Sequence, residues 1–226
     1  MFYSKFSLGK RISSGELLAN LMARCSWLCL PTNASWVEDV AGSGATGQAA
    51  PFLRVGTGTT VNSRGVLYST LYGICPGIDL EAFNWDKKLY LLFSIIRNAS
   101  DTEVVARVQI KPATTEGELA GGGIGLRIDN FALVGESYGT ALGTVNLGVT
   151  MTSGIPYRIA IIHYPGEKIE WWVDGVLKAR QTATANIPSG ATSYTHNAIV
   201  KSIINGATGG VEAYSYLCQP KIYQEI

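Results

Sequence analysis

Apolar and polar side chains alternate with a period of two over much of the chain, and this pattern constrains the fold most. In residues 104–111 an apolar set alternates with a more polar one: Val104, Ala106, Val108 and Ile110 against Val105, Arg107, Gln109 and Lys111. Residues 211–217 repeat the pattern. A period of two places alternate side chains on opposite faces of a β-strand, so these segments are expected to be half-buried strands.

Further strand-like runs follow one another at short intervals with turn residues between them. They cover residues 66–74, 88–97, 124–129, 144–150, 157–164, 168–173, 176–182 and 197–204. No helical pattern separates them, which favours a sandwich or barrel over a βαβ protein. We therefore expect an all-β fold, a two-sheet antiparallel β-sandwich.

The N-terminal fifty residues differ in character from the rest. Leu17, Leu18, Leu21, Met22 and Cys25 recur at helical spacing, which predicts one helix over residues 13–28. Its apolar face, together with Trp27, is a candidate assembly surface that packs on the sandwich or on a neighbouring subunit. Residues 41–50 are rich in Gly, Ala and Ser and predict a loop or linker. The expected division is an arm of residues 1–50 and a sandwich of residues 51–226.

The segment after residue 155 carries a recognisable block. A strand at 157–162 is followed by Pro165-Gly166, by Trp172-Val173-Asp174-Gly175-Val176-Leu177, and by Ile187-Pro188. Asp174-Gly175 is a strong signal for a type I′ hairpin, since both central positions need positive φ.

This block, best over residues 155–226, resembles the one found in concanavalin A-like proteins, including laminin-G modules and family-16-type glucanases. The resemblance implies a jelly roll. It also implies that Asp174 forms a turn and is neither a catalyst nor a metal ligand.

Charge and hydropathy exclude some classes of partner. Charged residues make up only 15% of the chain, the net charge is +1, and no block of Lys or Arg is present, which argues against nucleic acid. Arg24 and Arg97 break the longest apolar runs, so no membrane span is expected. Glu16, Asn20 and Arg24 interrupt the N-terminal apolar stretch, so no cleavable signal peptide is recognised.

The sequence offers no evident catalytic or metal centre. Glucanases of this fold carry closely spaced carboxylates on one strand as E-x-D-x-E, and that triplet is absent. Cys25 and Cys29 would form half of a metal site whose other half is missing, so neither a metal nor another cofactor is expected. Cys75 and Cys218 each close a strand and could form a disulfide if those strands are neighbours.

Three functions remain open. The first is a non-catalytic structural or decoration protein of a virion or extracellular assembly, with a homo-oligomer or a shell protein as partner, because low charge and abundant aromatics are typical of interfaces. The second is a carbohydrate-binding module, with Trp85, Trp172 and Tyr214 as candidate stacking residues. The third is a glycoside hydrolase or polysaccharide lyase, which the missing carboxylate triplet disfavours.

Overall fold

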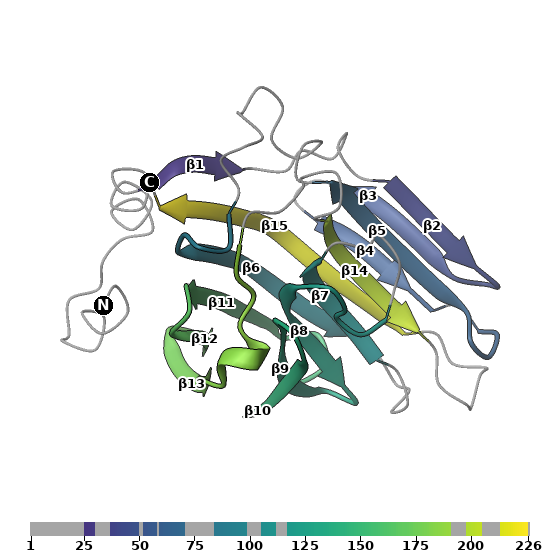
Figure 1. The fold of residues 1–226 in the computed structure, drawn as a ribbon. Coiled ribbons are helices and arrows are strands. Elements are labelled where there is room, and N and C mark those ends of the chain that lie inside the picture. Colours follow the sequence, from purple (N-terminus) through teal and green to yellow (C-terminus); the bar gives the residue numbers. More distant parts are fainter. Residues whose placement is uncertain are drawn as a thin grey trace.

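The computed structural model describes residues 25–29, 37–49, 52–57, 59–70, 84–98, 105–111, 117–190, 198–204 and 213–225. These residues form two antiparallel sheets of eight and seven strands that pack against each other (Figure 1). The expected antiparallel β-sandwich is confirmed.

The eight-stranded sheet has the order β13-β12-β11-β6-β15-β4-β3, and β1 also pairs with β15. Its strands are β1 (Cys25–Cys29), β3 (Ala45–Ala49), β4 (Phe52–Gly56), β6 (Leu89–Asn98), β11 (Pro156–Tyr164), β12 (Lys168–Val173), β13 (Val176–Gln181) and β15 (Tyr214–Glu225). The hairpins β11–β12 and β12–β13 lie at one end of this order.

The seven-stranded sheet has the order β10-β9-β8-β7-β14-β5-β2. Its strands are β2 (Val37–Ala41), β5 (Arg64–Thr70), β7 (Val105–Lys111), β8 (Gly123–Asp129), β9 (Ala132–Tyr138), β10 (Leu142–Thr150) and β14 (Ala198–Ile204). The ten segments in which we expected strands each overlap a strand of one of the two sheets.

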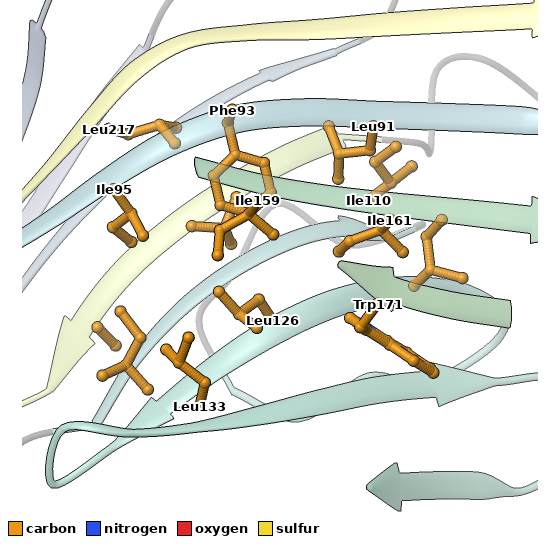
Figure 2. Packing of buried hydrophobic residues seen from close by; sticks show 14 of the residues in the cluster. Leu91, Phe93, Ile95, Ile110, Leu126, Leu133, Ile159, Ile161, Trp171 and Leu217 are labelled. Carbon is orange, nitrogen blue, oxygen red and sulfur yellow. The ribbon is translucent and has the colours of Figure 1, made fainter. Parts of the chain in front are cut away.

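The core lies between the sheets and is built by the alternation seen in the sequence. Figure 2 shows Phe93 and Ile159 from the eight-stranded sheet beside Leu126 and Leu133 from the seven-stranded sheet. Burying such side chains contributes about 1.5–3 kcal/mol each to folding. Alternate side chains of a strand therefore point either into the core between the sheets, which we call the inner face, or away from it, which we call the outer face.

Trp171 connects the two sheets through the core. Its indole N–H donates to the carbonyl of Gly125 at 2.9 Å. The ring also lies against Gly135, where an added Cβ would be 2.5 Å from the ring atom Cε2. A glycine at this point of β9 is therefore what leaves room for the tryptophan.

The predicted hairpin turn is present. Asp174 and Gly175 both have positive φ, 50° and 80°, as a type I′ turn requires. The Asp174 carboxylate also accepts a hydrogen bond from the backbone N–H of Arg158 at 3.0 Å, in keeping with a role in the turn.

The expected N-terminal helix is wrong where the structure tests it. Residues 13–24, with Leu17, Leu18, Leu21 and Met22, lie outside the described residues. Cys25–Cys29, which include Trp27, form strand β1, paired with the last residues of β15. The open edge of β15 supplies hydrogen-bond partners for the backbone groups of these residues. Tertiary pairing of this kind overrides the helical spacing of apolar residues in the local sequence. Among the described residues, the helical structure is one 3₁₀ turn, η4 (Thr184–Asn186).

The expected loop at residues 41–50 is present only at residues 42–44, which form a turn; it is wrong for Ala41, which ends β2, and for Ala45–Ala49, which form β3 and pair with β4. β3 is the edge strand of its sheet and pairs with one neighbour. This pairing is enough to form the strand, although its sequence has no alternating apolar pattern. Strands β1, β2, β4 and β9 were likewise not anticipated.

Candidate functional site

The aromatic residues predicted to stack on a ligand occupy two different environments. Trp85 is 2% exposed and packs edge-on against the ring of His163, with the centroids 5.4 Å apart, so it belongs to the core. Trp172 and Tyr214 are half-buried on the outer face of the eight-stranded sheet, because their neighbours Trp171 and Ala213 point into the core. The structure therefore leaves two of the three candidates on a surface.

Trp172 and Tyr214 are far apart on that face. The strand register places Trp172 level with Leu92 of β6 and Tyr214 level with Asn98 of the same strand. Six residues of strand correspond to roughly 20 Å. Tyr214 has its own cation, the guanidinium of Arg54, at 3.8 Å from the ring centroid. One small ligand could not contact both aromatics, whereas a protein surface could.

The surroundings of Trp172 form an apolar cluster supplied by four neighbouring strands. Its members are Tyr90 and Leu92 of β6, Ile162 and Tyr164 of β11, Trp172 of β12 and Tyr223 of β15. Tyr90, Ile162 and Tyr223 are buried, while Leu92, Tyr164 and Trp172 stay partly exposed. The cluster thus has a closed base and an accessible rim.

A buried carboxylate organises this rim. Glu170 precedes Trp172 by two residues on β12, and its side chain is only 4% exposed. Its Oε1 accepts a hydrogen bond from Arg180 Nε at 2.9 Å and lies 3.4 Å from Lys168 Nζ. Its Oε2 accepts from the Trp172 indole N–H at 3.2 Å and from the Tyr164 hydroxyl at 3.4 Å. We call these five residues the Glu170 cluster.

The cluster fixes the charge state of its two central groups. Burial alone would raise the pKa of Glu170, but the hydrogen bond from Arg180 and the charge and hydrogen bond of Lys168 outweigh it, so the pKa is lowered. Burial, followed by the negative charge of Glu170, raises the pKa of Tyr164 to about 12. At neutral pH Glu170 is a carboxylate and Tyr164 a neutral phenol.

A second ion pair extends the cluster toward β15. Lys88 Nζ lies 3.5 Å from Glu225 Oε1, which also accepts a hydrogen bond from the Tyr90 hydroxyl at 2.6 Å. The same ammonium lies 4.5 Å from the ring centroid of Tyr164. The Lys88 ammonium also lies 5.0 Å from the ring centroid of Tyr90, so it is within cation–π distance of one ring on β6 and one on β11.

The arrangement can hold a ligand or a partner in a fixed orientation. The Trp172 ring is tied to Glu170 through its indole nitrogen, and the neighbouring Arg180 side chain is 53% exposed. A group that seats on this rim meets an oriented aromatic face and a guanidinium. The sequence already contained one signal for the link between Glu170 and Trp172, because residues two apart on a strand share a face.

The remaining site predictions are only partly within the described residues. Cys218 lies half-buried in β15, but Cys75 falls outside them, so the disulfide stays a prediction. Within the described ranges no three His, Cys, Asp or Glu side chains converge as metal ligands would. A helix long and apolar enough to cross a bilayer is also missing from that part of the chain.

Comparison with known proteins supports the fold of this chain and nothing beyond the fold. No protein-family model matches the chain, and no curated protein matches it. Solved structures do match: the Bacillus licheniformis β-glucanase has a TM-score of 0.58 and 17% identity, covering 88% of this chain and 98% of the glucanase. The Emp47p carbohydrate recognition domain has a TM-score of 0.58 and 12% identity, covering 90% of this chain and 98% of that domain.

A toxin domain is similar over part of its length. The binding domain of Paraclostridial Mosquitocidal Protein 1 has a TM-score of 0.57 and 11% identity, covering 91% of this chain and 50% of that domain. The present chain thus spans about half the length of that binding domain. At such low identities these similarities establish a concanavalin A-like jelly roll, and a shared fold does not carry function with it.

Proposed function

We propose that this chain is a non-catalytic structural or decoration protein whose outer eight-stranded face contacts a partner protein, in the first instance another copy of the chain. We place it in an extracellular or virion assembly. The observation that carries the proposal is the presence of aromatics and arginines together on that face. Trp172 and Arg180 are both hydrogen-bonded to Glu170, and the Arg54 guanidinium lies over the ring of Tyr214.

The composition and spacing of this face suit a protein partner. Trp, Tyr and Arg are the residues most enriched among the hot spots of protein interfaces. The two centres are separated by roughly 20 Å along the strands, which matches the extent of a protein interface better than a single sugar ring. The low overall charge of the chain, 15%, favours the same interpretation.

Sedimentation velocity of the full chain tests the proposal. We expect the wild-type chain to sediment above its 24.2 kDa monomer mass. Replacing Trp172 by Ala should weaken the association by roughly ten-fold or more, since truncating a hot-spot residue costs about 2 kcal/mol or more. Thr150→Ala, an exposed position at the end of β10 in the other sheet, is the matched control and should leave the association unchanged.

Two results would contradict the proposal. One is a wild-type chain that stays monomeric at high concentration and also binds no other protein of the assembly in which it occurs. The other is an association that Trp172→Ala and Tyr214→Ala both leave intact. Circular dichroism on each variant separates a lost contact from a lost fold.

An enzymatic function has weaker support. A glycosidase needs a carboxylic acid that can donate its proton, which calls for a raised pKa. The pKa of Glu170 is lowered instead. Turnover of a laminarin-like or alginate-like polymer, abolished by mutating one acidic residue, would revive the hydrolase or lyase alternative.

A further inference from the structure

Residues 117–122 lie against the outer face of the seven-stranded sheet, immediately before β8. They form neither a helix nor a strand, and Leu119 is only 3% exposed although the residues on either side of it are exposed. Leu119 is not a member of the core cluster between the sheets. Its Cδ2 instead lies 3.0 Å from where a Cβ of Gly123 would be, on the face of β8 that points away from the core. We call residues 117–122 the strap.

Glycines with positive φ lie on both sides of Leu119 in the strap. The φ angle is 112° at Gly117 and 100° at Gly122. A Cβ at either position would meet nothing within 4 Å, so the backbone conformation requires these glycines and the available space does not. Glycine also reaches many other conformations without a steric penalty. Both ends of the strap are therefore suited to act as hinges.

Two polar contacts attach the strap to the sheet. Lys111 Nζ donates a hydrogen bond to the carbonyl of Gly117 at 3.3 Å, which is long for such a bond. Glu118 Oε1 lies 3.9 Å from Arg127 Nη1, and the Glu118 side chain is 59% exposed. An ion pair as exposed as this one contributes little to stability. Burial of Leu119 therefore supplies most of the attraction that these contacts give the closed strap.

A buried hydrogen bond lies between the two places where the strap meets β8. Gly125, midway between Gly123 and Arg127, is level with Gln109 on one side and with Glu136 on the other. Gln109 Nε2 donates to Glu136 Oε2 across this glycine at 2.7 Å. Both side chains point away from the core and are nevertheless 0% exposed. The contacts of the strap thus bracket a polar pair that is shielded from water.

The charges beneath the strap oppose its closure. Arg107 Nε lies 3.6 Å from Glu136 Oε2, and Arg127 Nη1 lies 3.7 Å from Glu136 Oε1, distances of ion pairs and too long for hydrogen bonds. Ion pairs of such geometry repay only part of the cost of removing their charges from water. Opening the strap would expose Leu119 but return water to Glu136. Because the two effects oppose each other, opening costs far less than unfolding the sandwich.

We propose that the strap is a hinged cover that opens and closes over the Gln109–Glu136 pair while both sheets stay folded. Leu119 holds it closed, and Gly117 and Gly122 are its hinges. The closed strap withholds a charged surface from solvent and from partners, and the open strap presents that surface. This device does not depend on the proposed protein contact, which uses the other sheet and shares no residue with the strap.

The side-chain amide protons of Gln109 report the opening directly in nuclear magnetic resonance spectra of the full chain. Their two signals are identified by their absence in Gln109→Met. In the wild type we expect them to exchange with water far more slowly than the amide protons of exposed side chains. Leu119→Ala should speed this exchange by roughly ten-fold or more, because the closed state loses a buried leucine side chain and the exchange rate follows the open fraction.

Leu147→Ala is the matched control. Leu147 is also 3% exposed, but it belongs to the core cluster, so its replacement should lower the thermal midpoint and leave the exchange of Gln109 unchanged. Gly117→Ala should speed the exchange as well, because alanine strains the closed backbone at this φ.

Three results would overturn the proposal. The first is a wild-type Gln109 amide that exchanges as fast as an exposed one, which would mean that no cover exists. The second is an exchange rate that neither Leu119→Ala nor Gly117→Ala raises. The third is an equal acceleration by Leu119→Ala and Leu147→Ala, which would assign the exchange to global unfolding.

Discussion

At the scale of single residues, His163 shows how the recognised block near the C-terminus anchors the core. The side chain is fully buried, its Nε2 lies 3.1 Å from the carbonyl oxygen of Pro188, and its ring contacts Trp85. Burial, opposed by the backbone hydrogen bonds, lowers the pKa of His163 from 6.5 to about 4. The Ile187-Pro188 pair therefore fixes a neutral imidazole between the sheets.

The folded protein should lose stability through this residue as the pH falls. Because the pKa in the folded state is depressed, the unfolded chain binds the proton first, below pH 6.5. The loss should grow from pH 6.5 toward pH 4 and reach on the order of 3 kcal/mol. Denaturant unfolding at pH 7, 5 and 4 should show a weaker pH dependence in His163→Gln than in the wild type. An equal dependence in both would show that His163 does not carry the effect.

At the scale of secondary-structure elements, the β8–β9 hairpin is built from an unusual turn. Asn130 and Phe131 both adopt positive φ, 46° and 71°, although Phe seldom does. The Phe131 ring packs against the core, and the Arg97 guanidinium lies 4.8 Å from its centroid. Packing of the ring offsets the backbone strain, and the turn carries no glycine for a sequence pattern to detect.

Substitutions at Phe131 should separate the strain from the packing. Both Phe131→Gly and Phe131→Ala remove the ring, but only glycine adopts positive φ without penalty. We expect the Gly variant to be more stable than the Ala variant by about 1 kcal/mol. Thermal or denaturant unfolding of the two variants measures the difference. An Ala variant as stable as the Gly variant would mean that the turn changes conformation once the ring is gone.

At the scale of the whole molecule, β15 holds the eight-stranded sheet together. It pairs with β6 on one side and, on the other, with β4 through its first residues and with β1 through its last. The yellow strand crosses the sheet between these partners in Figure 1. Strands from both ends of the chain thus meet in one sheet.

This arrangement sets where an assembly arm can be removed. Deleting residues 1–24 keeps β1 on β15 and should leave the far-ultraviolet circular dichroism of a β-protein unchanged. If the apolar residues 17–22 contribute to assembly, sedimentation should show a smaller species for this deletion than for the full chain. An unchanged oligomeric state would exclude that contribution. Deleting residues 1–30 also strips β1 from the edge of β15, so its effect on assembly would not be separable from its effect on the fold.

The sequence by itself determined the features that depend on near neighbours in the chain. The alternation of apolar and polar side chains predicted β7 and most of the other strands, and Asp174-Gly175 predicted a turn. Both features are set by adjacent residues, through the faces of a strand and the dihedral angles of a turn. For the site, Trp172 was predicted, whereas Glu170 was not, although its spacing of two residues from Trp172 on one strand is a signal that the two share a face. These inferences needed no knowledge of what lies opposite.

Only the tertiary structure decided which strands become neighbours. It made a strand of Cys25–Cys29 by offering them an edge of β15, buried Trp85 while leaving Trp172 accessible, and brought Gln109 to Glu136 across Gly125. Such contacts join residues far apart in the chain, and their free energy comes from backbone pairing and burial that no local pattern contains.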